Sequence, residues 1–223
     1  MVRVEQAIVL AAGRGNQVDG IAKSLIRHPV TGKTILQHAI EAFAGKKVIA
    51  VVGYRAIQVM ETHPEIDYVI NHNWEITNNA MSVGLALEDV PTYVVSGDIF
   101  FDRPLIEFLD GQSANLALTE NRENRPLSAI HCVTRPDGSI AATYQGPMQD
   151  AQHPEAIGLF KIADPQLLRQ WKRRCLAHAN MFGGQVLPCD GAPIMAVPRG
   201  AYAFDEINTP ADYLRLKERL RPA

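Results

Sequence analysis

"IVLAAGRGNQVDGIAKSLI", residues Ile8 to Ile26, is the stretch that decides the fold. Its short, continuous apolar run is typical of a strand covered on both faces, and it leads into a glycine-rich turn. Glycines let the backbone approach a phosphate closely, and successive N–H groups in such a turn form a nest for anions. Arg14 and Lys23 add two positive charges. We therefore expect this loop to bind a phosphate-bearing ligand.

Two well-known phosphate loops do not fit the spacing. A Walker loop needs a lysine directly after its last glycine, but two residues separate Gly20 from Lys23. A dinucleotide-binding G-x-G-x-x-G turn begins well with Gly13 and Gly15, but Val18 occupies the place of the third glycine. The loop therefore needs another explanation.

Composition limits the class of protein. The 223 residues and 47% hydrophobic content predict one domain spanning 1–223 with a sizeable core. A formal net charge of −2 gives no basic footprint for nucleic acid or an anionic membrane. The apolar run near the start is too short for a membrane span, and the three cysteines show no disulfide or metal-site spacing. We expect a cytoplasmic protein with neither a nucleic-acid nor a membrane partner.

The first half of the chain alternates between strand-like and helix-like segments. Expected strands are 7–11, 47–53, 68–70 and 92–96, and expected helices are 34–43, 80–87 and 104–109. This rhythm predicts an α/β fold with a doubly wound, mainly parallel sheet.

The second half is richer in short strands. Expected strands are 115–119, 129–133, 140–144, 157–162, 185–187 and 195–197, and expected helices are 165–179 and 210–220. We expect these strands to make the sheet mixed and to form a small β-rich extension.

The glycine loop also carries a family resemblance. The chain resembles the nucleotidyltransferases with a Rossmann-like, glycosyltransferase-A-like fold, whose signature is L-A-A-G-x-G-x-R…P-K-x-L. The matching residues are Leu10, Ala11, Ala12, Gly13, Gly15, Lys23 and Leu25. The resemblance implies that the loop wraps a nucleoside triphosphate, with Lys23 on a phosphate, so the anion is a substrate that is cleaved. Gln17 and Ala22 depart from the signature, where the family has arginine and proline, and Arg14 is a candidate for the missing charge.

Acidic residues follow the strand in "TYVVSGDIFFD". Carboxylates at the carboxyl edge of a parallel sheet lie where ligands bind, and Mg²⁺ on phosphates takes one or two of them. Asp98 matches the family's metal-binding aspartate, and Gly97 beside it is expected at the nucleotide. Asp102 is expected to cap the next helix instead.

The late stretch "FDEINTPADYLRL" resembles the family's E-I-D-T-P-E-D-L motif. The resemblance implies that Glu206 and Asn208 complete the Mg²⁺ site, with asparagine standing where aspartate is frequent. Asp212 is expected to be a first-turn helix charge, and a solvated loop is the alternative for the whole motif.

The stretch "NNAMSVGLAL" bears on the base. It resembles segments of cytidylyltransferases, which implies that Ser82, with Asn79, contacts cytosine. The alternative is simple helix capping with Ser82 exposed. Glu206 replaces a lysine of the isoprenoid enzymes, which favours the phosphocholine and aminoalkylphosphonate branch.

The acceptor site is less marked in the sequence. Trp74, Tyr144 and Phe204 are candidate walls for a choline-like head group, and Glu155 and Asp150 are candidate partners for an ammonium. Arg122 and Arg125 could reach an acceptor phosphate, but a solvated charged loop is the expected role for them.

Together these features predict a Mg²⁺-dependent cytidylyltransferase that moves CMP from CTP to a small phosphorylated or phosphonylated acceptor. A sugar-1-phosphate nucleotidyltransferase is one alternative, and an inactive nucleotide-binding homologue is another. The resemblance also implies a possible homodimer.

Overall fold

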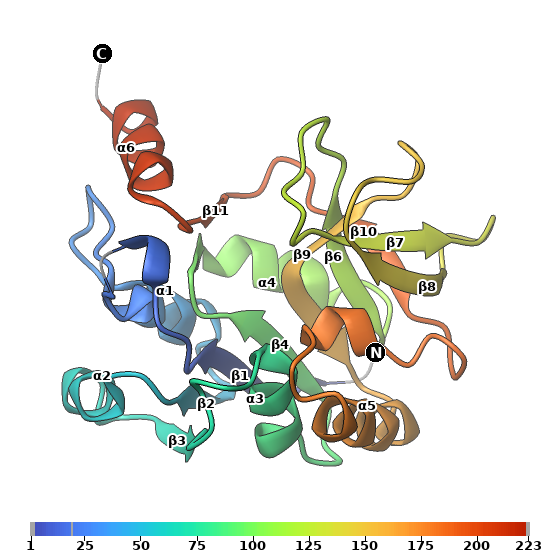
Figure 1. Cartoon of the computed structure of the whole chain (residues 1–223), viewed down its shortest axis with the longest axis horizontal. Coiled ribbons are helices and arrows are strands. Elements are labelled where there is room, and N and C mark those ends of the chain that lie inside the picture. The colour runs from blue at the N-terminus through green and yellow to red at the C-terminus, as the bar shows by residue number, and fades with distance from the viewer. Residues whose placement is uncertain (1–2, 19, 222–223) are drawn as a thin grey trace.

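The computed structural model describes residues 3–18 and 20–221, and a twisted sheet runs through its centre (Figure 1). Its strands are β1 (Gln6–Ala11), β2 (Lys47–Val52), β3 (Asp67–Ile70), β4 (Thr92–Ser96), β6 (Leu116–Glu120), β7 (Ile130–Thr134), β8 (Ile140–Gln145), β9 (Glu155–Ile162) and β10 (Met195–Pro198). The helices are α1 (Ile35–Ala42), α2 (Ala56–Thr62), α3 (Asn79–Ala86), α4 (Arg103–Asp110), α5 (Pro165–Ala177) and α6 (Pro210–Arg219).

The strand order is β10-β6-β9-β4-β1-β2-β3. Strand β1 pairs in parallel with β2 and with β4, β2 pairs in parallel with β3, and β10 with β6. Strand β9 runs antiparallel to β4 and β6, and β7 with β8 extends the sheet beside it. The predicted α/β class with a mainly parallel doubly wound sheet and a β-rich extension is confirmed.

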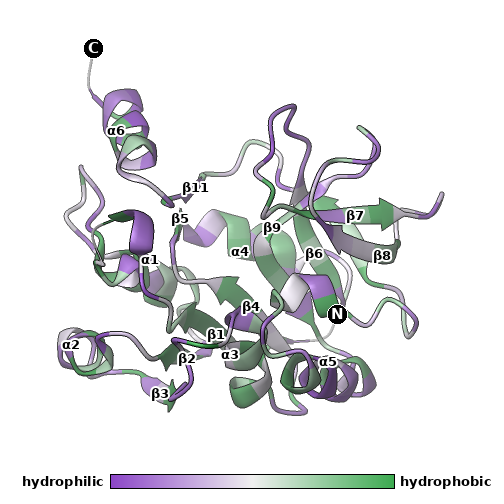
Figure 2. Cartoon of the chain, viewed as in Figure 1, coloured by the Kyte–Doolittle hydropathy of each residue, from purple (hydrophilic) through white to green (hydrophobic). Residues whose placement is uncertain are grey.

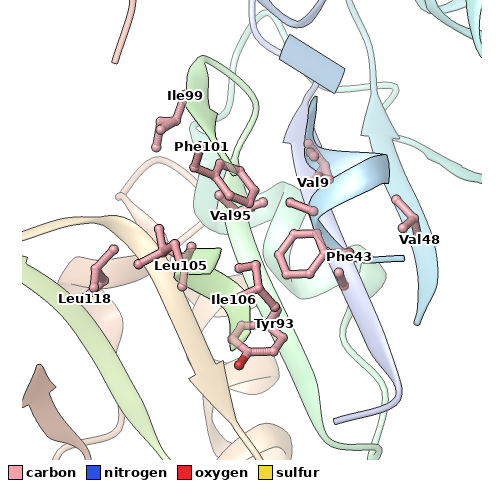
Figure 3. Close-up of a cluster of buried hydrophobic side chains, with 14 of the residues drawn as sticks. Val9, Phe43, Val48, Tyr93, Val95, Ile99, Phe101, Leu105, Ile106 and Leu118 are labelled. Atoms are coloured by element: carbon pink, nitrogen blue, oxygen red, sulfur yellow. The ribbon is translucent and has the colours of Figure 1, made fainter. Parts of the chain in front are cut away.

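Helices cover both faces of the sheet because its strands are apolar on both sides, as Figure 2 shows for the central strands. Leu36 of α1 and Leu105 of α4 pack with Val9 and Tyr93 on one face, the cluster drawn in Figure 3. Val83 of α3 and Trp171 of α5 pack with Ile8 and Val94 on the other face. The loops at the rim are largely hydrophilic (Figure 2).

One expected strand is wrong. Residues 185–187 do not form a strand; the 3-10 helix η3 (Gly183–Val186) stands there. A Cβ on Gly184 would lie 2.9 Å from the Phe160 ring, and the Gly183 carbonyl accepts a 2.8 Å hydrogen bond from the Trp171 indole. Close packing against two aromatic side chains therefore overrides the local apolar pattern.

Three short elements were not expected from the sequence. They are α2 and the two strands of a separate antiparallel pair, β5 (Ile99–Phe101) and β11 (Phe204–Glu206). Asp102 does precede α4, but its side chain makes no cap; it lies 3.3 Å from His38 Nδ1. None of the helices in residues 3–18 and 20–221 has the length and apolar character that a membrane crossing demands.

Candidate active site

The site begins where β1 and β4 end at the same edge of the sheet. The N–H of Gly97 donates a 3.0 Å hydrogen bond to the Leu10 carbonyl, which holds the two strand ends together. A Cβ on Gly97 would lie only 2.6 Å from that carbonyl oxygen, so no larger residue fits without moving the backbone. This close approach places Asp98 beside the start of the glycine loop.

Lys23 connects this edge to the end of the chain. It opens the short 3-10 helix η2 (Lys23–Leu25), and its Nζ lies 3.0 Å from Asp98 Oδ2 and 2.7 Å from Asn208 Oδ1. Three predicted site residues from distant parts of the sequence therefore meet at one ammonium group.

The segment that carries Glu206 and Asn208 is anchored on both sides. On one side, β11, which ends at Glu206, pairs with β5, and the next N–H, that of Ile207, donates a 2.8 Å hydrogen bond to the Asp98 carbonyl. On the other side, Thr209 and Asp212 form a reciprocal capping box at the start of α6. The Asp212 carboxylate also accepts a 3.0 Å hydrogen bond from the Asn208 N–H. Asp212 is therefore a helix-terminal charge, as predicted, and it positions Asn208.

The carboxylates at this point suit a hard divalent cation. Asp98 Oδ1 is buried and has no hydrogen-bond partner. Burial and, after it, the neighbouring Asp98 charge raise the pKa of Glu206, so a cation beside the two carboxylates would be favourable. Within residues 3–18 and 20–221 no three His, Cys, Asp or Glu side chains form a closed metal cage. A cation here would need ligands from a bound phosphate as well, which is how Mg²⁺ sits in many nucleotide sites.

The glycine loop divides into a ligand-facing part and a structural part. Leu10, Ala11, Ala12, Gly13 and Arg14 line the cavity described below. Gly15 does not line it: a Cβ there would lie 2.5 Å from Val18 Cγ2, and its carbonyl accepts hydrogen bonds from two residues of the loop. Gly15 therefore shapes the turn, whereas Gly13, with nothing within 4 Å of its Cβ position, leaves space open.

A cavity of about 1130 Å³ joins these elements. It is lined by the glycine loop, by Lys23, Asp98, Glu206 and Asn208, by the N-terminal half of α3, and by the start of β9. Its size suits a nucleotide with a second small substrate.

The α3 wall of the cavity presents polar side chains. Asn78, not Asn79, is the N-cap of α3, and Asn79 Oδ1 accepts a 2.7 Å hydrogen bond from the Gly183 N–H. Ser82 is only 3% exposed and its Oγ accepts a 3.2 Å hydrogen bond from Asn71 Nδ2. The exposed-serine alternative is therefore wrong, and the Ser82 hydroxyl keeps a proton to donate.

Comparison with known proteins agrees with this geometry. A family model described as "MobA-like NTP transferase domain" matches residues 7–179. The chain belongs to this family. It is therefore a nucleotidyltransferase, and the family and enzyme class expected from the glycine loop are confirmed.

Among curated relatives, CMP-5'-(3-aminopropyl)phosphonate synthase of Streptomyces rubellomurinus is 30% identical over 178 residues, which cover 74% of this chain and 28% of the relative. The bifunctional protein GlmU of Methanococcus maripaludis is 30% identical over 126 residues, 53% of this chain and 31% of that protein. The chain thus spans less than a third of the length of these relatives. The CTP:phosphocholine cytidylyltransferase LicC from Streptococcus pneumoniae has the same fold, with a TM-score of 0.77 at 19% identity over 99% of this chain and 100% of that one.

The residues predicted to bind the acceptor do not all lie at the cavity of this nucleotidyltransferase. Trp74 and Glu155 line the cavity. Tyr144 does not: its ring stacks on His131 with centroids 4.8 Å apart, and its hydroxyl lies 3.2 Å from His153 Nδ1. Tyr144 therefore belongs to the packing of the β-rich extension.

Arg122, for which the sequence predicted a solvated loop, lies at the cavity instead. It lines the cavity, and its Nε donates a 2.7 Å hydrogen bond to Glu120 Oε2. Its Nη1 lies 4.0 Å from Glu155 Oε2. In the sequence, the sign of this role is Glu120, an acidic residue at the end of a strand and two residues before Arg122. Its meaning becomes clear only when the pairing of that strand in the sheet is known.

Proposed function

We propose that this nucleotidyltransferase moves CMP from CTP to a small phosphorylated or phosphonylated acceptor of the phosphocholine or aminoalkylphosphonate type and releases pyrophosphate. The observation that carries the proposal is the meeting of Lys23, Asp98 and Asn208 at the mouth of the glycine loop, inside one cavity. The reactions for which two similar proteins are named, CMP-5'-(3-aminopropyl)phosphonate synthesis and CTP:phosphocholine cytidylyl transfer, support the choice of CTP and of this acceptor class.

The reaction needs alignment and charge stabilisation more than proton transfer. An oxygen of the acceptor's phosphate or phosphonate, already anionic, attacks the α-phosphorus of CTP and forms a new P–O–P link. The bond from the α-phosphorus to the oxygen bridging the β-phosphorus breaks, and pyrophosphate leaves with its electron pair. We assign to Lys23 the stabilisation of the charge that grows at the α-phosphate, and to the loop N–H groups with Arg14 the binding of the leaving phosphates; both side chains line the cavity.

A Mg²⁺ ion fits the oxygen donors present. Asp98, with Glu206 or Asn208, would hold it, and the unpartnered Asp98 Oδ1 is the donor that such an ion would satisfy. When bound, it would supply positive charge to the triphosphate. Lys23 then orients Asp98 from its other oxygen, Oδ2.

Base selection is assigned to the α3 wall. Ser82, which is buried, and Asn79 both line the cavity. Hydrogen bonds from buried polar groups discriminate strongly between bases, since a wrong base leaves them unpaired.

Pyrophosphate release in the presence of Mg²⁺ tests the proposal. CTP, UTP, GTP and ATP are each paired with phosphocholine, 2-aminoethylphosphonate and a sugar 1-phosphate. We expect release with CTP and an amino-bearing phosphate or phosphonate. Release only with a sugar 1-phosphate would replace the proposal by a sugar nucleotidyltransferase, and CTP binding without release would indicate an inactive homologue.

A further inference from the structure

Glu155 differs from Asp98 and Glu120, each of which forms an ion pair of 3.0 Å or shorter. Asp98 is paired with Lys23, and Glu120 accepts hydrogen bonds from Arg122 and Arg199. Glu155 is 6% exposed, yet its Oε2 has no hydrogen-bond partner, since Arg122 Nη1 stays 4.0 Å away. A buried carboxylate without a donor is unfavourable, so a functional reason for it is needed.

We infer that Glu155 receives a primary ammonium group of the acceptor, so that the enzyme selects amine-bearing phosphates or phosphonates and rejects quaternary ammonium compounds. The inference rests on the proposed function and names the acceptor class for the same site. A primary ammonium carries three N–H donors and a positive charge, and it would give Glu155 Oε2 the hydrogen bond that this oxygen lacks in the free protein, where Arg122 Nη1 stays 4.0 Å away. Glu155 lines the cavity at the first residue of β9, where the acceptor can reach it beside Arg122.

The surroundings of Glu155 argue against a quaternary ammonium. Such a cation has no N–H to donate and is recognised by exposed aromatic faces. Across the sheet Glu155 faces Glu120 and His131, and the ring of His131 is covered by Tyr144. Of the aromatic residues that line the cavity in the described chain, Phe160, Trp171 and Phe204 are buried.

The two partly exposed rings stand on other elements. Trp74, in the loop before α3, packs against Gly53, and its ring meets that of Tyr54 edge-on. Phe182 directly precedes η3, whose Gly183 is bound to Asn79 of α3. Both belong to the wall assigned to the base, so they do not build an aromatic cage around Glu155.

Arg122 complements this arrangement. Its Nε is fixed by Glu120, which leaves the Nη atoms on the cavity side, next to Glu155. A zwitterionic acceptor with an anionic group a few bonds from its ammonium would find one guanidinium and one carboxylate about that far apart. The pair Arg122 and Glu155 thus matches the charge pattern of an aminoalkylphosphonate or phosphoethanolamine.

The test compares acceptors that differ only in the amine. Values of kcat/KM are measured with phosphoethanolamine, ethyl phosphate and phosphocholine, and with 2-aminoethylphosphonate and ethylphosphonate, for the wild type and Glu155→Gln. Glu123→Gln, at an exposed position in the loop that also carries Arg122, is the control for loss of one negative charge. We expect the wild type to favour each amine over its neutral counterpart about 10- to 100-fold, and phosphoethanolamine over phosphocholine at least about tenfold.

Glu155→Gln should bring the amine-to-neutral ratio to about one while the KM for CTP stays unchanged, and Glu123→Gln should leave the ratio as in the wild type. An unchanged ratio in Glu155→Gln, or a preference for phosphocholine, would overturn the inference.

Calorimetric binding of the same acceptors, with Mg²⁺ and a non-hydrolysable CTP analogue, separates this outcome from failure of the proposed function. If no nucleotide turns over but Glu155→Gln still abolishes amine-dependent binding, the result supports the ammonium site and refutes the proposed cytidylyl transfer. Equal binding of amine and neutral compounds by the wild type refutes the ammonium site.

Discussion

At the scale of single residues, the ammonium group of Lys23 has two roles that the geometry couples. It neutralises Asp98 and contacts Asn208, and it lies where an α-phosphate is expected. A group that holds the site together before the ligand arrives is already oriented when charge develops, which is the most effective form of electrostatic catalysis.

Lys23→Ala should therefore lower kcat by about 100- to 1,000-fold while the protein still folds. The ion pair is partly exposed, so its loss should move the unfolding temperature by no more than ~4 °C. Steady-state pyrophosphate release and thermal unfolding measure the two effects. Lys33→Ala, which removes an exposed pair with Glu41, is the control and should leave kcat unchanged. Full turnover in a folded Lys23→Ala variant would refute the assignment.

The burial of Glu155 should lower the stability of the protein, although the same carboxylate is inferred to bind the acceptor. Burial raises its pKa above the ordinary value of 4.5; Arg122 and Arg125 oppose the shift, and Glu120 adds to it. Because the folded state binds this proton more tightly than the unfolded chain does, the free energy of unfolding falls as pH rises from 4.5 through the raised value. Ionisation of Glu155 therefore lowers the stability of the free protein.

Glu155→Gln should accordingly stabilise the protein by about 1 kcal/mol at pH 7, or ~2–4 °C in unfolding temperature. The gain should shrink as pH falls from the raised pKa to 4.5 and be lost below 4.5, where Glu155 is protonated in both the folded and the unfolded chain. Thermal unfolding of both proteins from pH 4 to pH 8 checks this. A stability gain that is the same at every pH would point to packing and not to the charge.

At the scale of elements, two glycines at the same sheet edge have opposite reasons for being glycine. Gly97 has no room, because a Cβ would lie 2.6 Å from the Leu10 carbonyl between the ends of β1 and β4. Gly13 has nothing within 4 Å of its Cβ position, although it lines the cavity. The first glycine serves the sheet, and the second leaves space for a ligand.

Alanine at the two positions should separate these reasons. Gly97→Ala should destabilise the protein by about 1–3 kcal/mol, lowering the unfolding temperature by several degrees, because the strand ends must move apart. Gly13→Ala should unfold at or slightly above the wild-type temperature but raise the KM for CTP about tenfold. The unfolding temperature and the KM for CTP of both variants test these predictions. If Gly13→Ala and the wild type have the same KM for CTP, the triphosphate does not bind at this part of the loop.

The elements that were predictable are those with a strong local signal. Strand β1 is a continuous buried run, and α1 has its N-cap at Thr34 and an apolar face. Helix α2 has neither: its N-cap, Arg55, is in the left-handed region without a side-chain cap, and of its residues only Val59 is buried. Strands β5 and β11 have three residues each and depend on each other, so no periodicity could reveal them.

At the scale of the whole molecule, the site is assembled from chain segments that meet only in the folded state. The Lys23–Asn208 contact spans 185 residues, and the Ile207 hydrogen bond to the Asp98 carbonyl joins the C-terminal segment to β4. The resemblance to a known signature predicted that Lys23, Asp98, Glu206 and Asn208 belong together, and the structure brings them into one cavity. Arg122 could not be predicted in this way, since a loop of charged residues looks solvated until its strand neighbours are known.

Because ligand contacts would connect distant segments, nucleotide and Mg²⁺ should stabilise the entire fold. At concentrations about 100 times the dissociation constant, CTP with Mg²⁺ should add about 2.7 kcal/mol, or ~5–10 °C in unfolding temperature. The increment due to Mg²⁺ should disappear in Asp98→Asn, whose amide cannot supply the negative charge that the ion requires, while a smaller shift from CTP alone persists. Asp102→Asn is the matched control, since this nearby carboxylate is bonded to His38 and lies outside the cavity lining. Thermal unfolding with CTP in Mg²⁺ or in chelator, on the three proteins, measures each increment. A full Mg²⁺ increment in Asp98→Asn would move the cation site away from β4 and leave Glu206 and Asn208 as its remaining candidates.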